Sequence, residues 1–179
     1  MLSPPPAPVS PRPARTSDCS SLATLSIEVW IGSYIREGIN GFFADYALTE
    51  FTADRFANLL TDPTELLLVS ENRNGIDGYI RLRTGHNPPT GATSDTEIAT
   101  LYVQPRHQGK GIGEHLLRAG LEQCQQLNWG HPWLAVNSEN TGAIAFYMRQ
   151  GFVSIGQTHF QIQHERYLNE VLQLSSSRG

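Results

Sequence analysis

The segment Gln108-Gly109-Lys110-Gly111-Ile112-Gly113 carries the strongest structural signal in this chain of 179 residues. Its alternating glycines separate two segments of different hydrophobic period: residues 97–103 fit a half-buried strand, and apolar residues recur at helical spacing over 112–127. A tight turn from strand to helix is therefore predicted. Glycine lets the N–H groups of such a turn close around an anion, and the following helix N-terminus adds unpaired donors. The segment is typical of a phosphate-binding turn.

The spacing of this turn argues against two common phosphate-binding motifs. A P-loop has Ser or Thr after Gly-Lys, whereas Gly111 follows Lys110 here. A dinucleotide-binding turn has a final glycine where this chain has Glu114, and it also needs an acidic residue on a following strand. The remaining pattern, Q-x-x-G-x-G from Gln108 to Gly113, resembles the pyrophosphate-binding motif of the GNAT superfamily of acyl-CoA-dependent N-acetyltransferases. The alternative is a glycine-rich turn without a ligand.

A second segment, residues 140–152, resembles a later motif of the same family, N-x-x-A-x-x-x-Y-x-x-x-G-F. Asn140 is expected to cap a short helix that carries Tyr147, and Gly151 to end it in the left-handed conformation. The resemblance covers residues 9–174. It implies the α/β GNAT acyl-CoA N-acyltransferase fold, in which a mixed central sheet of six to seven strands is flanked by about four helices.

Local signals predict the remaining elements. We expect a short first strand over 9–13, a helix capped by Asp18 and reaching Ile35, an aromatic loop, and a helix over 52–60. Two strands over 65–71 and 77–83 are expected to meet at a turn around Asn74-Gly75. Three further strands are expected over 132–137, 153–162 and 167–174. The last two strands are expected to form a two-stranded arm, either internal or exchanged with a second copy. Self-association as a homodimer stays open.

Length and composition fit one domain over residues 9–174, with a Pro-rich, flexible N-terminus over 1–13 that runs into the first strand. The net charge of −4 and the lack of a basic cluster argue against nucleic acid and an anionic membrane surface as partners. No apolar run of about twenty residues is present, so a soluble, cytoplasmic protein is expected. Cys19 and Cys124 are expected to be buried thiols, and the histidine spacing predicts no metal site.

The resemblance implies acetyl-CoA as the acyl donor. Backbone groups of residues 101–103 would pair with its pantetheine arm, and N–H groups of residues 109–114 would hold its pyrophosphate. The implied coenzyme-binding residues are Leu101, Tyr102, Val103, Gln108, Gly109, Lys110, Gly111, Ile112, Gly113, Glu114, Asn140 and Tyr147. The strand ending at Val103 is expected to separate from the strand ending at Val136, which would admit the pantetheine arm.

Acetyl transfer to an amine needs a neutral amine, a stabilised oxyanion and a proton for the leaving thiolate. Tyr147 stands where the family places its general acid; the alternative is a core aromatic residue. Glu97 lies six positions before Val103, where some members of the family place the base that removes the amine proton; the alternative is a solvated charge. The backbone N–H of Val103 is the oxyanion donor that the resemblance implies.

The implied function is transfer of the acetyl group of acetyl-CoA to a primary amine of a small molecule or peptide, by direct attack in a ternary complex. The alternative is an acyl-CoA-binding regulatory or interaction module without catalytic activity. The candidate residues of the amine site are Trp30, Tyr34, Phe42, Phe43 and Tyr46, with Asp45 or Glu50 to attract a cationic amine. For Trp30, burial in the core is the expected role, because an amphipathic helix must bury one face.

Overall fold

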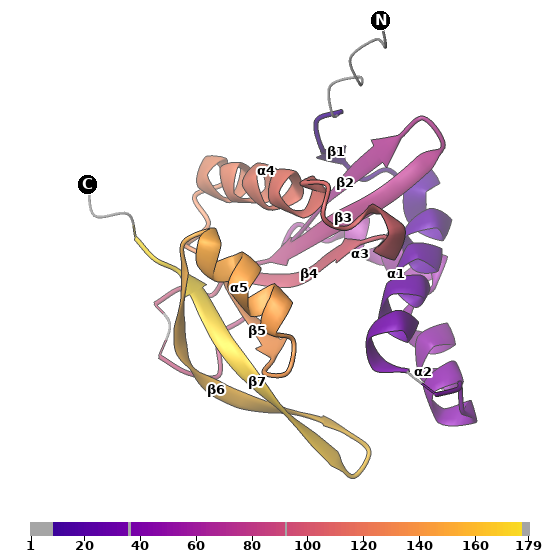
Figure 1. Ribbon diagram of the computed structural model, residues 1–179. Helices are drawn as coiled ribbons and strands as arrows, with labels where there is room; N and C mark the ends of the chain where they lie inside the picture. The colour runs from indigo at the N-terminus through magenta and orange to yellow at the C-terminus, as the bar shows by residue number, and fades with distance from the viewer. Residues whose placement is uncertain (1–8, 36, 92, 177–179) are drawn as a thin grey trace, which may run out of the picture. The chain divides into compact units, whose positions relative to one another are not determined.

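The computed structural model describes residues 9–35, 37–91 and 93–176. Over these residues the chain forms seven strands and five α-helices (Figure 1). The strands are β1 (Arg12–Pro13), β2 (Glu65–Asn72), β3 (Gly75–Arg83), β4 (Glu97–Val103), β5 (Trp133–Asn137), β6 (Phe152–Ile162) and β7 (Glu165–Leu174). The helices are α1 (Cys19–Tyr34), α2 (Gly41–Glu50), α3 (Ala53–Thr61), α4 (Ile112–Gln126) and α5 (Thr141–Arg149), with short 3-10 helices at Thr16–Asp18 and Pro105–His107. The predicted α/β fold is confirmed.

The seven strands form one mixed sheet in the order β1-β2-β3-β4-β5-β7-β6. β5 pairs antiparallel with β7 along all of Trp133–Asn137. β4 pairs in parallel with β5 at Glu97 and Trp133, near the start of each strand. No further parallel pair joins these two strands among the described residues. The separation expected between Val103 and Val136 stays a prediction, because these residues belong to different units.

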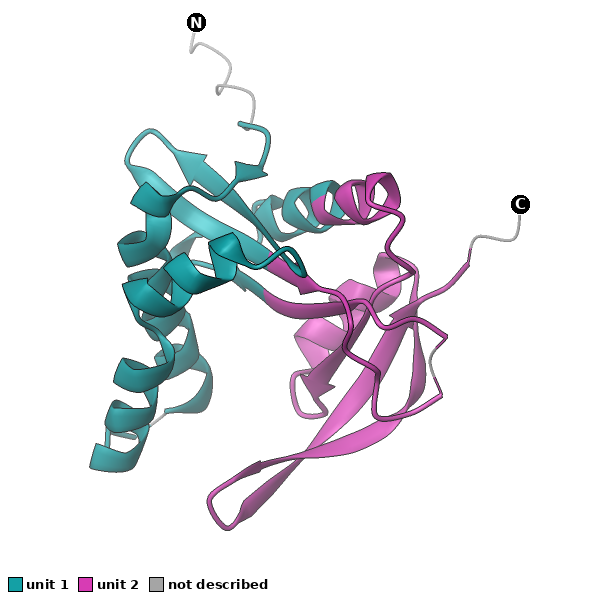
Figure 2. Cartoon of the chain, turned by 180° about the vertical axis from the view of Figure 1, so that it is seen from behind, with its two compact units in different colours: residues 1–80, 101–119 teal, residues 81–100, 120–179 magenta. Residues whose placement is uncertain are grey.

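Two compact units divide the chain, and each is described by itself. Unit 1 contains Met1–Ile80 and Leu101–Ala119, and unit 2 contains Arg81–Thr100 and Gly120–Gly179. The unit boundaries fall inside β3, β4 and α4, as the colours of Figure 2 show. The single domain over residues 9–174 stays a prediction, and residues 1–8 of the Pro-rich N-terminus lie outside the described residues.

The core of unit 1 is built from α1, α3, β2 and β3. Its buried members are Cys19, Leu22, Ala23, Leu25 and Val29 of α1, Phe56 of α3, Leu67 and Val69 of β2, and Tyr79 of β3. The Tyr79 hydroxyl lies 2.7 Å from the Ser26 hydroxyl, so the polar end of this buried ring is hydrogen-bonded. Both cysteines are buried free thiols, as predicted.

The segment predicted as an aromatic loop after α1 forms the helix α2 instead. The Asn40 side chain caps this helix by accepting a hydrogen bond from the Phe43 N–H at 3.0 Å. Tyr46 of α2 stacks on Trp30 of α1, with ring centroids 5.0 Å apart. The prediction was wrong because the local pattern shows no clear polar face, and a ten-residue helix depends on packing against a neighbour more than on its own propensity.

Other local signals in unit 1 placed elements within one or two residues. The Thr52 hydroxyl caps α3 by accepting a hydrogen bond from the helix backbone at 3.2 Å, as predicted. The β2–β3 hairpin is confirmed, but its turn lies one residue earlier than predicted, and Gly75 begins β3 with a φ of 146°. The Asn72 side chain accepts a hydrogen bond from the Asn74 N–H at 2.8 Å, which fixes the turn at this position.

Unit 2 contains a long hairpin made by β6 and β7. Its antiparallel pairs run from Phe152 and Leu174 to Ile162 and Glu165, with an irregularity between Ser154 and Gly156. The predicted two-stranded arm therefore pairs within the chain. Three residues of this hairpin are buried: Phe152 of β6, and Val171 and Leu172 of β7.

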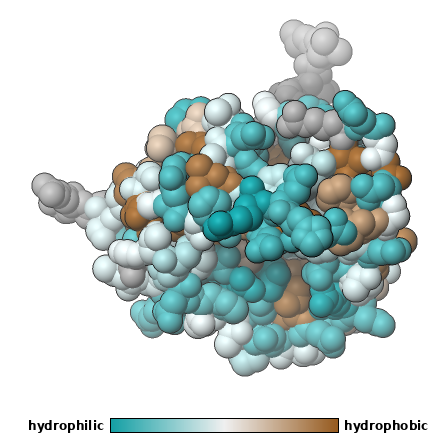
Figure 3. Space-filling model, turned by 90° about the horizontal axis from the view of Figure 1, so that it is seen from below, coloured by the Kyte–Doolittle hydropathy of each residue, from teal (hydrophilic) through white to brown (hydrophobic). Residues whose placement is uncertain are grey.

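The described surface is mixed in polarity. Its exposed large hydrophobic residues are Val9, Tyr34, Ile39, Phe42, Leu48, Leu127, Met148, Val153, Phe160 and Leu168. On the face seen in Figure 3, hydrophobic side chains form small separate patches among hydrophilic ones. Among the helices of the described ranges, none has the length and apolar character needed to cross a membrane.

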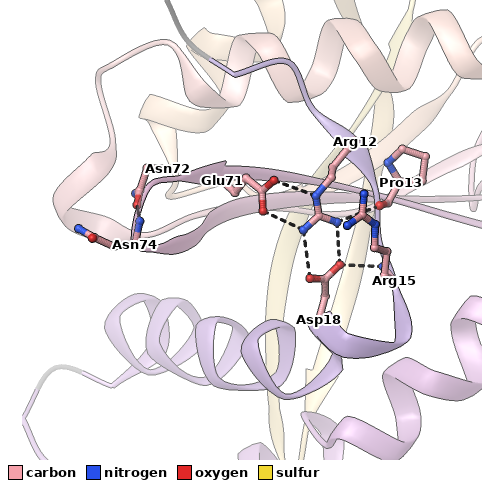
Figure 4. A network of polar contacts seen from close by, with 7 residues as sticks. All are labelled: Arg12, Pro13, Arg15, Asp18, Glu71, Asn72 and Asn74. Carbon is pink, nitrogen blue, oxygen red and sulfur yellow. Dashed lines mark hydrogen bonds and ion pairs between the residues drawn. The ribbon is translucent and has the colours of Figure 1, made fainter. Parts of the chain in front are cut away.

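An ion-pair network fixes the N-terminal edge of unit 1 (Figure 4). The Arg12 guanidinium donates to both carboxylate oxygens of Glu71, at 2.9 and 2.8 Å, and to both of Asp18, at 2.9 and 3.2 Å. Asp18 stands before α1 as predicted, but its side chain does not cap that helix. The carboxylate is held by Arg12 and by the Arg15 N–H, at 2.7 Å. The hydrogen bonds from Arg12 hold the pKa of Asp18 below its usual range.

We predict that Asp18→Asn lowers the free energy of unfolding by about 1 to 3 kcal/mol near neutral pH, because Arg12 loses a charged partner in a largely buried place. Since the folded pKa of Asp18 is depressed, its contribution is complete above the unfolded pKa of about 3.9 and is lost as the pH falls through the folded pKa. Urea unfolding from neutral to strongly acidic pH measures the difference between the two proteins. A difference that stays constant on acidification would contradict the ionic role.

Candidate active site

The predicted phosphate-binding turn lies in unit 1 and has the backbone geometry that its glycines suggest. Gly109 and Gly111 have φ of 75° and 82°, in the left-handed region that favours glycine, and α4 begins directly after them. The first hydrogen bond of the helix runs from the His115 N–H to the Gly111 carbonyl at 3.0 Å. Among the described residues, none accepts a hydrogen bond from the N–H groups of residues 109–114. Unpaired donors at the positive end of a helix dipole can hold a phosphate.

The side chains of this turn have separate roles. Lys110 is exposed, and Glu114 forms an ion pair with an arginine one turn further along α4, at 3.1 Å. The Gln108 side chain donates a hydrogen bond from Nε2 to the Val103 carbonyl at 3.2 Å. This bond ties the turn to the end of β4, whose residues 101–103 are the predicted pantetheine-binding segment. The structure thus brings these two predicted groups together within unit 1.

Gly78 on β3 sets how closely α4 approaches the sheet. A Cβ at this position would lie 2.9 Å from the Tyr102 carbonyl oxygen, 3.1 Å from Leu116 Cδ1 and 3.3 Å from Ile112 Cγ2. Because Ile112 is the first residue of α4, the N-terminus of the helix rests on the glycine. A lone glycine inside a strand pattern is a signal of such a close approach, and Gly78 could have been recognised from it.

Tyr147, the predicted general acid, lies in unit 2 on α5. Asn140 caps this helix as predicted, accepting a hydrogen bond from the Ala143 N–H at 3.1 Å. Tyr147 is 8% exposed, and its ring contacts those of Phe146 and Phe152, with centroids 5.1 and 5.4 Å away. Burial raises its pKa above the usual phenol range, so the hydroxyl keeps its proton at neutral pH. No described residue hydrogen-bonds this hydroxyl.

Glu97, the predicted base, begins β4 and is bound by an arginine that the sequence analysis did not single out. Arg83 of β3 donates from Nε to Glu97 Oε2 at 2.6 Å, and the Glu97 side chain is 13% exposed. The guanidinium occupies one carboxylate oxygen and leaves Oε1 for another partner. The catalytic role of Glu97 stays a prediction. The alternation of polar and apolar residues along a strand could not identify Arg83 as the partner. The ion pair joins β3 to β4, and the register between two strands is not visible in the sequence of either one.

The predicted site residues fall into two groups. Residues 101–103 and 108–114 belong to unit 1, and Glu97, Asn140 and Tyr147 belong to unit 2. The candidate residues for the amine site lie on α1 and α2, in unit 1. Within the described part of the chain, no three His, Cys, Asp or Glu side chains gather into a group that could hold a metal ion.

The model of the acetyltransferase (GNAT) family matches residues 33–152, which is more than half of the chain. The chain belongs to the GNAT acetyltransferase family. The glycine turn, residues 108–113, and the segment around Tyr147, residues 140–152, both lie inside the matched range. The resemblance drawn from these two motifs is therefore confirmed.

Known relatives of this GNAT chain are acetyltransferases. It is 31% identical over 121 residues to an uncharacterized N-acetyltransferase of Mycobacterium bovis, covering 66% of this chain and 72% of the relative. It is 31% identical over 102 residues to the N-alpha-acetyltransferase RimI of Mycobacterium tuberculosis, covering 56% of this chain and 60% of the relative. The PaiA N-acetyltransferase from Thermoplasma acidophilum, solved in complex with coenzyme A, has the same fold: the TM-score is 0.70 at 18% identity, covering 89% of this chain and 96% of that chain.

We predict that Gly78→Ala lowers the free energy of unfolding by about 1 to 3 kcal/mol, because the added methyl group has no free space between β3 and α4. Acetyl-CoA affinity should fall as well, since the N–H donors of residues 109–114 move with α4. Urea unfolding and calorimetric titration measure the two effects. Gly32→Ala in α1 is the matched control, because nothing lies within 4 Å of its added Cβ. Full stability and affinity in Gly78→Ala would contradict the packing role.

Gly111→Asp should abolish measurable binding of acetyl-CoA and of desulpho-CoA. The φ of 82° strains any residue with a Cβ, and the new carboxylate repels the pyrophosphate from the N–H groups. Calorimetric titration of the folded variant measures this, with circular dichroism to show that the fold is kept. If the folded wild-type protein also binds neither ligand, the glycine turn has a structural role only.

Proposed function

We propose that this chain transfers the acetyl group of acetyl-CoA to a primary amine of a small molecule or peptide, by direct attack in a ternary complex. Membership in the GNAT acetyltransferase family supports acetyl transfer as the reaction class. Acetyl-CoA as the donor is supported by the unpaired N–H groups of residues 109–114. The observation that carries catalysis over simple binding is Tyr147, a buried phenol whose hydroxyl no described residue hydrogen-bonds.

The coenzyme would be held mainly by the main chain. The N–H groups of residues 109–114 hold the pyrophosphate, and the backbone of residues 101–103 pairs with the pantetheine amides. The Gln108–Val103 hydrogen bond fits this arrangement, because it couples the two binding segments. The Lys110 side chain adds charge near the phosphates, but an exposed lysine contributes less than preorganised backbone donors.

In the proposed reaction the neutral amine nitrogen bonds to the thioester carbonyl carbon, and the C–S bond then breaks. Charge that develops on the carbonyl oxygen is stabilised by the Val103 N–H. The Tyr147 hydroxyl gives its proton to the leaving thiolate of coenzyme A. The proton lost by the nitrogen passes to Glu97 or to water. Because burial raises the pKa of Tyr147, its acid form persists throughout the range in which amines become neutral.

Tyr147→Phe should lower kcat about a hundredfold, because it removes the general acid and keeps the ring that contacts Phe152. The dissociation constant for acetyl-CoA should stay within about twofold of the wild-type value, since the binding donors lie in the backbone. Release of coenzyme A, followed with a thiol reagent, measures turnover, and calorimetry measures binding.

Tyr167→Phe on β7 is the matched control, because it removes the same hydroxyl from a residue outside the candidate site. It should keep wild-type turnover. Equal turnover in Tyr147→Phe and the wild type would overturn the general-acid role. A wild-type chain that binds acetyl-CoA and acetylates no amine would instead be the acyl-CoA-binding module without catalytic activity.

A further inference from the structure

An aromatic cluster joins α1 and α2 in unit 1. The Trp30 ring is its centre, and the centroids of four other rings lie 5.0 to 6.3 Å from it. The members of the aromatic cluster are Trp30, Tyr34, Phe43, Tyr46 and Phe51. Tyr46 stacks on the indole with 23° between the ring planes. The cluster therefore presents flat, apolar surface from several directions.

The aromatic cluster has a buried centre and an exposed rim. Trp30 is 5% exposed, which confirms its expected place in the core. Tyr34 is 40% exposed, and Phe42, whose ring contacts Phe43 at 5.5 Å, is 36% exposed. An apolar ligand can pack on such a rim without disturbing the core, because the rim rings already face solvent.

Three phenol hydroxyls in and beside the aromatic cluster have no hydrogen-bond partner among the described residues. Tyr34, Tyr46 and Tyr102 donate no hydrogen bond to any described residue and accept none. Tyr102 packs against the core to which α1 contributes, with its ring centroid 5.8 Å from that of Tyr79. Glu28 of α1 also accepts a hydrogen bond from Gln104, which follows β4 directly. Burial raises the pKa of Tyr102 above the phenol range. Tyr102 directly precedes Val103, the proposed oxyanion donor. The cluster thus reaches the strand on which the thioester is proposed to lie.

Of the two carboxylates that were expected to attract a cationic amine, Asp45 directly precedes Tyr46 and pairs with no described residue, whereas Glu50 is engaged. Glu50 forms an ion pair with Arg55, at 2.6 Å. Burial raises the pKa of Tyr46, and the charge of Glu50 raises it further. Glu28 of α1 accepts a hydrogen bond from the Gln104 side chain at 3.0 Å. Recognition of a polycation needs several free carboxylates, because each ammonium group must be matched when it loses water. The surroundings of the cluster suit one ammonium group at most, on a body that is apolar.

We propose that the acceptor is a primary amine with one positive charge on an aromatic or apolar body, of the arylalkylamine type, and that this body packs on the rim of the aromatic cluster. The inference rests on the proposed function. Tyr34 and Tyr46 contact the body of the amine through their rings, and their free hydroxyls accept hydrogen bonds from the ammonium group. The faces of these rings also attract the cation.

The experiment compares three amines as acceptors for the purified full chain at saturating acetyl-CoA: 2-phenylethylamine, n-butylamine and spermidine. We expect kcat/KM for 2-phenylethylamine to exceed that of each other amine at least tenfold, which corresponds to a good aromatic contact. Tyr34→Ala should raise the KM for 2-phenylethylamine about fivefold and leave the KM for n-butylamine unchanged. Phe160→Ala is the matched control, because Phe160 is similarly exposed, at 44%, but lies on β6.

The outcomes separate this inference from the proposed function. Preference for spermidine, or an equal effect of Tyr34→Ala on both monoamines, would overturn the inference while acetyl transfer stands. If acetyl-CoA binds and no amine is acetylated, the proposed function fails. Calorimetric titration of 2-phenylethylamine into the chain saturated with coenzyme A then tests whether the aromatic cluster binds the amine. Binding that Tyr34→Ala weakens about fivefold would support the cluster as the amine site, and no binding would overturn it.

Discussion

The close approach of α4 to β3 at Gly78 is the constraint on which the proposed coenzyme-binding turn depends. A single Cβ at this position would be too close to the backbone of β4 and to two side chains of α4. The N–H groups of residues 109–114 can hold a pyrophosphate only if they are unpaired and correctly aimed, and packing of the helix on the strand fixes their aim. The Gln108–Val103 hydrogen bond holds the other end of the turn. In the proposed function, affinity for the coenzyme therefore depends on packing geometry more than on the exposed Lys110.

Burial has a double effect on the proposed acid. It raises the pKa of Tyr147, which keeps the proton in place but makes the phenol a weaker donor. The same loss of hydration raises the pKa of a buried thiol, as it does in this chain for Cys124, to about 11. A thiolate that forms in a dry site is therefore a stronger base than one in water, and proton transfer from a buried phenol to it is correspondingly easier.

Predictions that depended on neighbouring residues were the most accurate. The Thr52 cap of α3 needed only a hydroxyl and an N–H group three residues away, and the structure shows it. The expected loop over α2 was wrong because that helix is held by Tyr46 stacking on Trp30, a contact between separate elements. The expected cap at Asp18 was wrong for a similar reason, since Arg12 of β1 binds its carboxylate. Neither partner is marked by the local pattern.

For this chain, glycine spacing and hydrophobic period predicted the strand, turn and helix of the proposed coenzyme site. The resemblance of two motifs to the GNAT family gave the family and the candidate residues Tyr147 and Glu97. These signals are readable because they reflect backbone conformations that single residues favour or forbid. Only the tertiary structure showed that Arg83 binds Glu97, that Gly78 lets α4 approach β3, and that four rings gather around Trp30. Such contacts join residues that are distant along the chain, so their energies depend on tertiary packing and have no counterpart in local sequence.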